Sequence, residues 1–211
     1  MAEKGILVVV SGFSGAGKGT LMKRLMEKYD NYALSVSATT RAPRPGEEHG
    51  REYFFHTKQE FEELILQDAL IEYAQYVENY YGTPKAYVEK QLNAGKDVIL
   101  EIEIQGALKV KKKLPDTLLL FVTPPTAEEL KNRLVNRGTE TMEVIESRLR
   151  RASEEAQGMS EYDLSLIHIF WGNGLFQCCL LLRFLWRYCG EWVIRFLLVG
   201  FFLFCWEFCL W

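Results

Sequence analysis

Apolar runs alternate along the chain with segments whose apolar residues have helical spacing. The strand-like runs are Ile6–Val10, Tyr32–Val36, Tyr53–Phe55, Leu70–Tyr76, Val98–Ile104 and Thr117–Val122. Helical patterns cover residues 18–29, 57–67, 85–94, 126–138 and 141–157, and a lysine run at 109–113 ends a further helix. Strands that alternate with helices predict an α/β fold with a parallel sheet and crossover helices.

Two segments between these elements have turn chemistry. Residues 37–47 contain Pro43, Pro45 and Gly46 and so are not the interior of a helix. Residues 79–84 are rich in hydroxyls and contain glycine and proline, and we expect a turn there. Thr57 and Thr126 each precede a glutamate by three residues, a spacing that predicts a helix N-terminus.

The composition fits one α/β domain over most of the 211 residues. A net charge of −3 indicates neither a nucleic-acid surface nor an anionic-membrane surface. Met1–Lys4 leads straight into the first strand, so we expect a cytoplasmic protein without a signal peptide.

The composition changes after Asp163. All five cysteines and all five tryptophans lie beyond it, and residues 164–211 carry only five charges. The segment Leu164–Ile169 resembles a translated sequencing adapter, and we interpret residues 164–211 as an aberrant hydrophobic tail that is foreign to the evolved domain. The alternative is a membrane segment, because residues 164–182 are uncharged and approach the roughly 20 residues that a spanning helix needs. We expect no membrane partner if the tail is foreign.

A glycine-rich loop joins the first strand to the first helix. Strand, loop and helix start are the context in which such a motif cradles phosphate, through backbone N–H groups and a lysine. A tight turn that merely needs glycines would not need the lysine. Gly19 stands where a hydroxyl residue more often follows the lysine, so we expect phosphate oxygens and water to hold Mg²⁺, with Thr20 as a secondary ligand. The candidate ATP-binding residues are Gly12, Phe13, Ser14, Gly15, Ala16, Gly17, Lys18, Gly19 and Thr20.

Arginines predict a second phosphate site and a lid. Arg41 and Arg44 lie three apart in the proline-rich segment, and arginine forks match phosphate oxygens two at a time. The alternative is a solvated basic loop. Four arginines of the last two helices are candidates to close over a triphosphate. Two phosphate sites favour phosphoryl transfer between nucleotides with water excluded. The lid candidates are Arg133, Arg137, Arg148 and Arg151.

Residues 5–162 resemble the guanylate kinase family. The resemblance rests on the loop at 12–20, on the pattern at 37–53, on Ile71-Glu72, and on residues 80–83, 101–106 and 133–139. It implies a P-loop nucleoside monophosphate kinase fold over residues 1–163, with its C-terminal strand and helix missing or replaced. The implied parts are a core of 1–36 and 96–125, a GMP-binding region of 37–95 and a lid of about 126–157. The implied reaction moves the γ-phosphoryl group of ATP, bound with Mg²⁺, to GMP.

The resemblance also assigns roles. It implies that Arg41, Arg44, Tyr53 and Tyr81 hold the GMP phosphate and that Ser37, Glu72, Thr83 and Glu103 hold guanine. Lys18, Arg41, Arg137 and Arg148 are the implied catalytic residues, Arg133 and Arg137 contact ATP, and Glu101 orients Mg²⁺ through water.

The nucleobase chemistry agrees with these roles. Guanine carries N1–H and N2–H₂ groups that donate hydrogen bonds to carboxylates. Adenine would leave a buried carboxylate unpaired, which costs about 1–3 kcal/mol. The alternative is that Glu72 and Glu103 are solvated carboxylates at a sheet edge.

Two other functions stay open at this point: a kinase for another nucleoside monophosphate, and a guanylate-kinase-like binding module without catalysis. The intact loop lysine argues against the module. With its last strand missing, we expect the domain to have an open sheet edge that threatens folding and activity.

Overall fold

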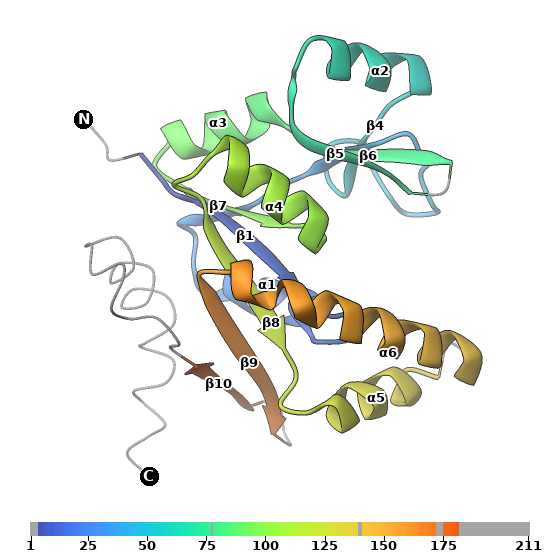
Figure 1. Cartoon of the computed structure of the whole chain (residues 1–211). Coiled ribbons are helices and arrows are strands. Elements are labelled where there is room, and N and C mark those ends of the chain that lie inside the picture. The colour runs from blue at the N-terminus through green and yellow to red at the C-terminus, as the bar shows by residue number, and fades with distance from the viewer. Residues whose placement is uncertain (1–3, 77, 139–140, 172–174, 182–211) are drawn as a thin grey trace. The chain divides into compact units, whose positions relative to one another are not determined.

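The computed structural model describes residues 4–76, 78–138, 141–171 and 175–181 (Figure 1). The chain forms two compact units. The first unit comprises residues 1–10 and 24–118, and the second comprises residues 11–23 and 119–211. The strand β1 (Leu7–Gly12) and the helix α1 (Lys18–Lys28) each have residues in both units.

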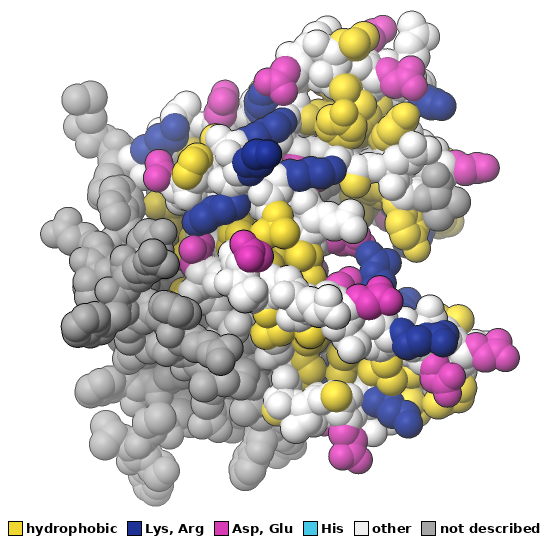
Figure 2. All heavy atoms as spheres, in the orientation of Figure 1, with side chains coloured by type: hydrophobic (Ala, Val, Ile, Leu, Met, Phe, Trp, Pro, Cys, Tyr) yellow, Lys and Arg dark blue, Asp and Glu magenta, His cyan; other side chains and the backbone are white. Residues whose placement is uncertain are grey.

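Parallel strands form the core of the first unit. β1 pairs in parallel with β7 (Asp97–Glu101), which pairs in parallel with β2 (Tyr32–Leu34). Val8, Val9 and Ile99 are fully buried, as the continuous apolar runs predict for parallel strands covered on both faces. The helices α3 (Lys85–Asn93) and α4 (Ile104–Lys113) also belong to this unit. Figure 2 shows Lys and Arg side chains gathered over these helices, and α4 ends in the predicted lysine run.

A second sheet in this unit has the order β4-β3-β6-β5, and its strands are β4 (Tyr53–Phe55), β3 (Ser37–Thr39), β6 (Asn79–Pro84) and β5 (Leu70–Tyr76). β3 pairs in parallel with β4, whereas β6 is antiparallel to both β3 and β5. The helix α2 (Lys58–Leu66) contributes Phe61 to a core with Ala38 and Leu70. Both halves of the predicted capping box at Thr57 are present.

The turn predicted at residues 79–84 is wrong, because these residues form β6. Gly82 lies opposite Tyr73 of β5, where a Cβ atom would come within 2.9 Å of the Glu72 carbonyl oxygen. The glycine therefore serves close packing between strands. Cross-strand pairing, which local composition does not reveal, decides the structure here.

Apart from Leu118, the strand β8 (Leu118–Thr123) belongs to the second unit. This unit also contains α5 (Ala127–Asn136), α6 (Met142–Ala156), the short 3₁₀ helix η1 (Gln157–Glu161), β9 (Leu164–Trp171) and β10 (Leu175–Leu181). α5 and α6 share a buried cluster of Leu130, Leu134, Ile145 and Ala152, against which Phe13 and Leu149 pack. Thr126 caps α5 by accepting a hydrogen bond from the Glu129 backbone N–H at 3.1 Å.

We expected an open sheet edge beside the last core strand, and the structure corrects this expectation. β9 pairs in parallel with β8, with Leu120 opposite Leu164 and Thr123 opposite Ile167, and β10 adds antiparallel to β9. The start of the segment interpreted as a tail thus occupies the edge of β8, because an extended backbone supplies the hydrogen bonds of the ladder whatever its side chains are. Residues 182–211 and Thr139 lie outside the described residues.

Two further findings concern the end of one strand and the character of the helices. The strand predicted over residues 98–104 ends at Glu101, and Ile104 already begins α4. Within the described part of the chain, no helix combines the length and the apolar character needed to cross a membrane.

Candidate active site

The glycine-rich loop of the second unit is shaped by backbone constraints. Gly12 and Gly15 have φ angles of 150° and 91°, a region that favours glycine. A Cβ atom on Gly12 would lie 2.1 Å from the Val122 carbonyl oxygen of β8, and one on Gly15 would lie 2.9 Å from Leu134 Cδ2 of α5. The backbone conformation therefore favours glycine at both positions, and at Gly12 the approach of the β8 backbone also leaves no space for a side chain.

Lys18, the first residue of α1, folds back over this loop. Its Nζ donates hydrogen bonds to the carbonyl oxygens of Gly12 at 2.7 Å and Phe13 at 3.2 Å. The helix N-terminus supplies backbone N–H groups and partial positive charge at the same place. Gly19 and Thr20 are exposed in the first turn. Loop, lysine and helix start together have the properties of an anion site.

Two of the predicted lid arginines contact the loop. Arg133 donates from Nη1 to the Ala16 carbonyl oxygen at 3.1 Å and from Nε to Glu129 Oε1 at 2.7 Å. Arg148 donates from Nη1 to Ser14 Oγ at 2.5 Å. Arg151 instead pairs with Glu155 along α6, and Arg137 lies exposed at the end of α5.

The first unit holds Arg41 through a carboxylate. Arg41 Nη2 donates to both oxygens of Glu47, at 3.0 and 2.9 Å, and the Arg44 backbone N–H donates to Glu47 Oε2 at 2.7 Å. The backbone hydrogen bond from Arg44 and the guanidinium of Arg41 hold the pKa of Glu47 below its usual value, although desolvation opposes them. Glu47 therefore stays ionised and orients Arg41.

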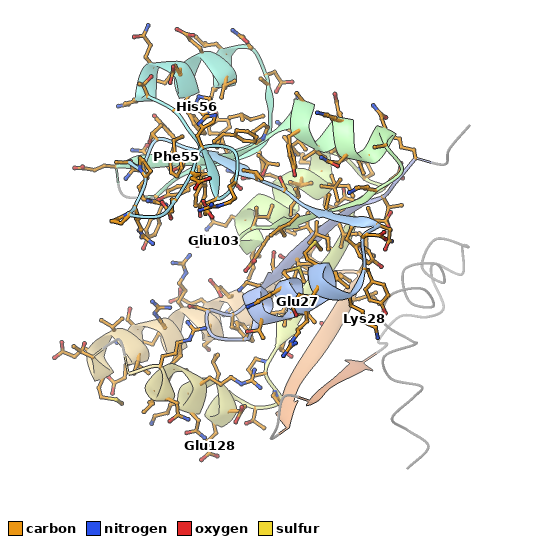
Figure 3. The ribbon with its side chains drawn as sticks, turned by 180° about the vertical axis from the view of Figure 1, so that it is seen from behind. Glu27, Lys28, Phe55, His56, Glu103 and Glu128 are labelled. Carbon is orange, nitrogen blue, oxygen red and sulfur yellow. The ribbon has the colours of Figure 1, made fainter. Side chains whose placement is uncertain are left out.

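Aromatic rings surround the Arg41 guanidinium, whose Cζ lies 5.3 Å from the ring centroid of Tyr53 and 5.8 Å from that of Phe55. The ring centroids of Tyr53 and Tyr81 are 6.2 Å apart. The structure thus brings together three of the four residues predicted for the GMP phosphate. Arg44 is exposed in the same loop. In Figure 3, Phe55 is labelled at the end of β4, and Glu103 is labelled directly before α4.

Glu72 is a buried carboxylate with only 7% of its surface exposed. Thr83 Oγ1, itself fully buried, donates a hydrogen bond to Glu72 Oε1 at 2.9 Å. Burial raises the pKa of Glu72, while the Thr83 hydrogen bond and the charges of Lys109 and Lys113 oppose that rise. The alternative of a solvated carboxylate is thereby excluded for Glu72.

The remaining predicted residues have different surroundings. Ser37 lies opposite Tyr53 in the β3–β4 pair and is partly buried. Glu103 precedes α4 and is exposed, and its side chain makes no cap hydrogen bond to that helix. Glu101 ends β7 with an exposed side chain, in register with Val10 of β1.

Glu47 is the residue to which sequence reasoning gave no role. It lies in the pattern at residues 37–53, and its spacing of three after Arg44 is the signal that could have found it. Because one carboxylate binds one arginine side chain and the other arginine's backbone, it determines the shape of the loop that carries both.

Comparisons with known proteins agree on one family. The sequence model described as guanylate kinase matches residues 4–168, ending within β9. The guanylate kinase of Lactococcus lactis subsp. lactis (strain IL1403) is 55% identical over 168 residues, which are 80% of this chain and 82% of that protein. That of Streptococcus thermophilus (strain CNRZ 1066) is 55% identical over 169 residues, which are 80% of this chain and 81% of that protein.

A solved structure agrees as well. The crystal structure of guanylate kinase from Anaplasma phagocytophilum is 31% identical and has a TM-score of 0.60. It covers 79% of this chain and 79% of its own.

Proposed function

The chain belongs to the guanylate kinase family, and from this premise we propose that it transfers the γ-phosphoryl group of ATP to GMP, giving ADP and GDP. The observation that carries the nucleobase assignment is the buried pair of Glu72 and Thr83. An ionised carboxylate there accepts hydrogen bonds from guanine N–H groups, and adenine offers no N1–H to replace them.

We assign ATP to the loop of the second unit. Backbone N–H groups and Lys18 neutralise its phosphates, and Arg133 and Arg148 already bond to the loop that cradles them. Phosphoryl transfer needs positioning and charge neutralisation more than covalent chemistry. We propose that Arg148 and Arg137 stabilise the phosphoryl group during its transfer. Arginines in this role raise kcat by roughly 10³–10⁵-fold.

We assign the GMP phosphate to Arg41, Arg44, Tyr53 and Tyr81, and guanine to Ser37, Glu72, Thr83 and Glu103. The support is the gathering of Arg41 with the two tyrosine rings and the burial of Glu72 beside Thr83. In this division residues 37–95 bind GMP, residues 1–36 and 96–125 form the core, and residues 126–157 act as the lid.

Mg²⁺ is the metal that this reaction uses with ATP, and it supplies charge neutralisation between the phosphates. The residues fit such a role only weakly. Thr20 and Glu101 offer the oxygen ligands that Mg²⁺ prefers, but the described part of the chain contains no cluster of three or more His, Cys, Asp or Glu. We therefore assign most of the coordination to phosphate oxygens and water.

A coupled ADP-release assay of the full chain tests the proposal, with GMP, AMP, CMP and UMP compared at fixed Mg-ATP. We expect GMP to exceed each competitor by about 10³-fold or more in kcat/KM, because a site that hydrogen-bonds a substrate rejects analogues that leave it unpaired. A preference for AMP would overturn the assignment of Glu72. ATP binding without turnover of any nucleotide would indicate a binding module instead.

A further inference from the structure

Gly106 lies in the first turn of α4, three residues after Glu103, the residue that precedes the helix. It is absent from the described glycines with positive φ, so its backbone conformation is open to any residue. Glycine is, after proline, the least favourable residue within a helix. Neither conformation nor helix propensity therefore explains a glycine here, and the explanation must come from space.

The carboxylate of Glu72 lies next to Gly106. A Cβ atom on Gly106 would lie 3.2 Å from Glu72 Oε2, 3.3 Å from Ile102 Cδ1 and 3.7 Å from Glu72 Cδ. Contacts this short require a neighbour to move by a few tenths of an ångström. Glu72 has little freedom to do so, because it is buried and its other oxygen accepts the hydrogen bond from Thr83.

Gly82, the other glycine beside Glu72, is crowded differently. A Cβ atom there would meet the Glu72 carbonyl oxygen at 2.9 Å, Tyr73 Cβ at 3.0 Å and the Phe61 ring at 3.1 Å. These neighbours belong to the packing of the sheet. Only at Gly106, of these two positions, is the carboxylate itself the obstacle.

We propose that Gly106 is a positioning residue for guanine selection, because its missing side chain leaves the Glu72 carboxylate room to stay bonded to Thr83 and to accept guanine N–H groups. This inference rests on the proposed function. The Glu72 carboxylate on β5 and the first turn of α4 thus act together in base selection. The helix contributes the space that Gly106 leaves beside the carboxylate.

The test compares five proteins as full chains: wild type, Gly106→Ala, Glu72→Asp, the double variant with both changes, and Lys112→Ala. The last is the control, because it also places alanine in α4, at an exposed position. KM and kcat are measured for GMP, AMP and ATP, and Tm is measured for each protein.

We expect Gly106→Ala to raise the KM for GMP about tenfold and to narrow the preference for GMP over AMP, since small displacements of positioned groups carry large costs. The KM for ATP should stay within twofold. Aspartate is one methylene shorter and retreats from position 106, so in the Glu72→Asp background the same alanine should change the KM for GMP less than twofold. Lys112→Ala should match wild type.

Two results would overturn the inference: an unchanged KM and base preference in Gly106→Ala, or an equal effect of the alanine in both backgrounds, which would indicate a purely structural role. If Gly106→Ala does not fold, recovery of folding in the double variant supports the inference and continued failure contradicts it. Failure of the proposed function looks different, because wild type itself would then not phosphorylate GMP.

Discussion

The two proposed nucleotide sites are built by different means. In the second unit the phosphate loop depends on backbone: glycines at positive φ, a close approach to β8, and a lysine that bonds to loop carbonyls. In the first unit the proposed GMP site depends on pairs of side chains, Arg41 with Glu47 and Glu72 with Thr83. A backbone cradle holds phosphates whatever the base. Of the two side-chain pairs, we assign Arg41 with Glu47 to the phosphate of GMP and Glu72 with Thr83 to selection of the base. Substitutions in the two regions should therefore fail in different ways.

The largest effect is expected from removing the loop lysine. Lys18→Met keeps the side chain's length but removes the charge next to the transferred group, so kcat should fall about 10²–10³-fold or more. The affinity for GMP should stay within twofold, because we assign GMP to the other unit. Steady-state rates and calorimetric titration with GMP measure the two quantities. A matching loss of GMP affinity would show that the two sites are not independent.

Two arginines sharpen the same contrast. Arg44→Ala should raise the KM for GMP by about 10–100-fold, since it removes a charged hydrogen-bond donor from the phosphate clamp, and should leave the KM for ATP nearly unchanged. Arg137→Ala should mainly lower kcat, because we place that residue in the lid. Full kinetics with each substrate varied distinguish these effects. The reverse pattern would refute the division between clamp and lid.

Glu47 gives a smaller and more specific effect. Glu47→Gln removes the charge that orients Arg41, and we expect the KM for GMP to rise about tenfold with kcat and the KM for ATP little changed. Glu48→Gln is the matched control, because Glu48 is exposed and pairs with Arg51 instead. Equal behaviour of the two variants would exclude a positioning role for Glu47.

The smallest effect concerns stability. Because burial raises the pKa of Glu72, the folded protein holds this proton more tightly than the unfolded chain. Wild type therefore loses stability as the pH rises from the ordinary value of 4.5 through the raised pKa, and Glu72→Gln escapes that loss. The Tm of Glu72→Gln minus the Tm of wild type should therefore be more positive at about pH 8 than at about pH 4, by a few degrees. A difference in Tm that is constant with pH would contradict the raised pKa.

The two regions also differ in how far they can be predicted from sequence. The loop at residues 12–20 is one contiguous motif whose chemistry follows from local rules, and both its strand and its helix were located correctly. The proposed GMP site combines residues from β3, β4, β5 and β6 with others outside that sheet, and the sequence does not predict the sheet because β6 has the composition of a turn. Only the family resemblance connected Glu72 with Thr83.

Other features lay beyond local patterns altogether. The position of Leu164–Trp171 as a strand depends on pairing with β8, which spacing along the chain does not encode. The roles of Glu47 and Gly106 depend on contacts across loops and elements. Gly106, whose proposed function is to leave space, has no side-chain chemistry to detect in a sequence.

The central claim is that guanine selection resides in the first unit and is separate from ATP binding. Calorimetric titration of Glu72→Gln with GMP and with Mg-ATP tests it most directly. We predict a loss of GMP affinity of about 10²-fold, from the lost charged acceptor, with ATP affinity within twofold of wild type. Unchanged GMP affinity, or an equal loss for both nucleotides, would contradict the account.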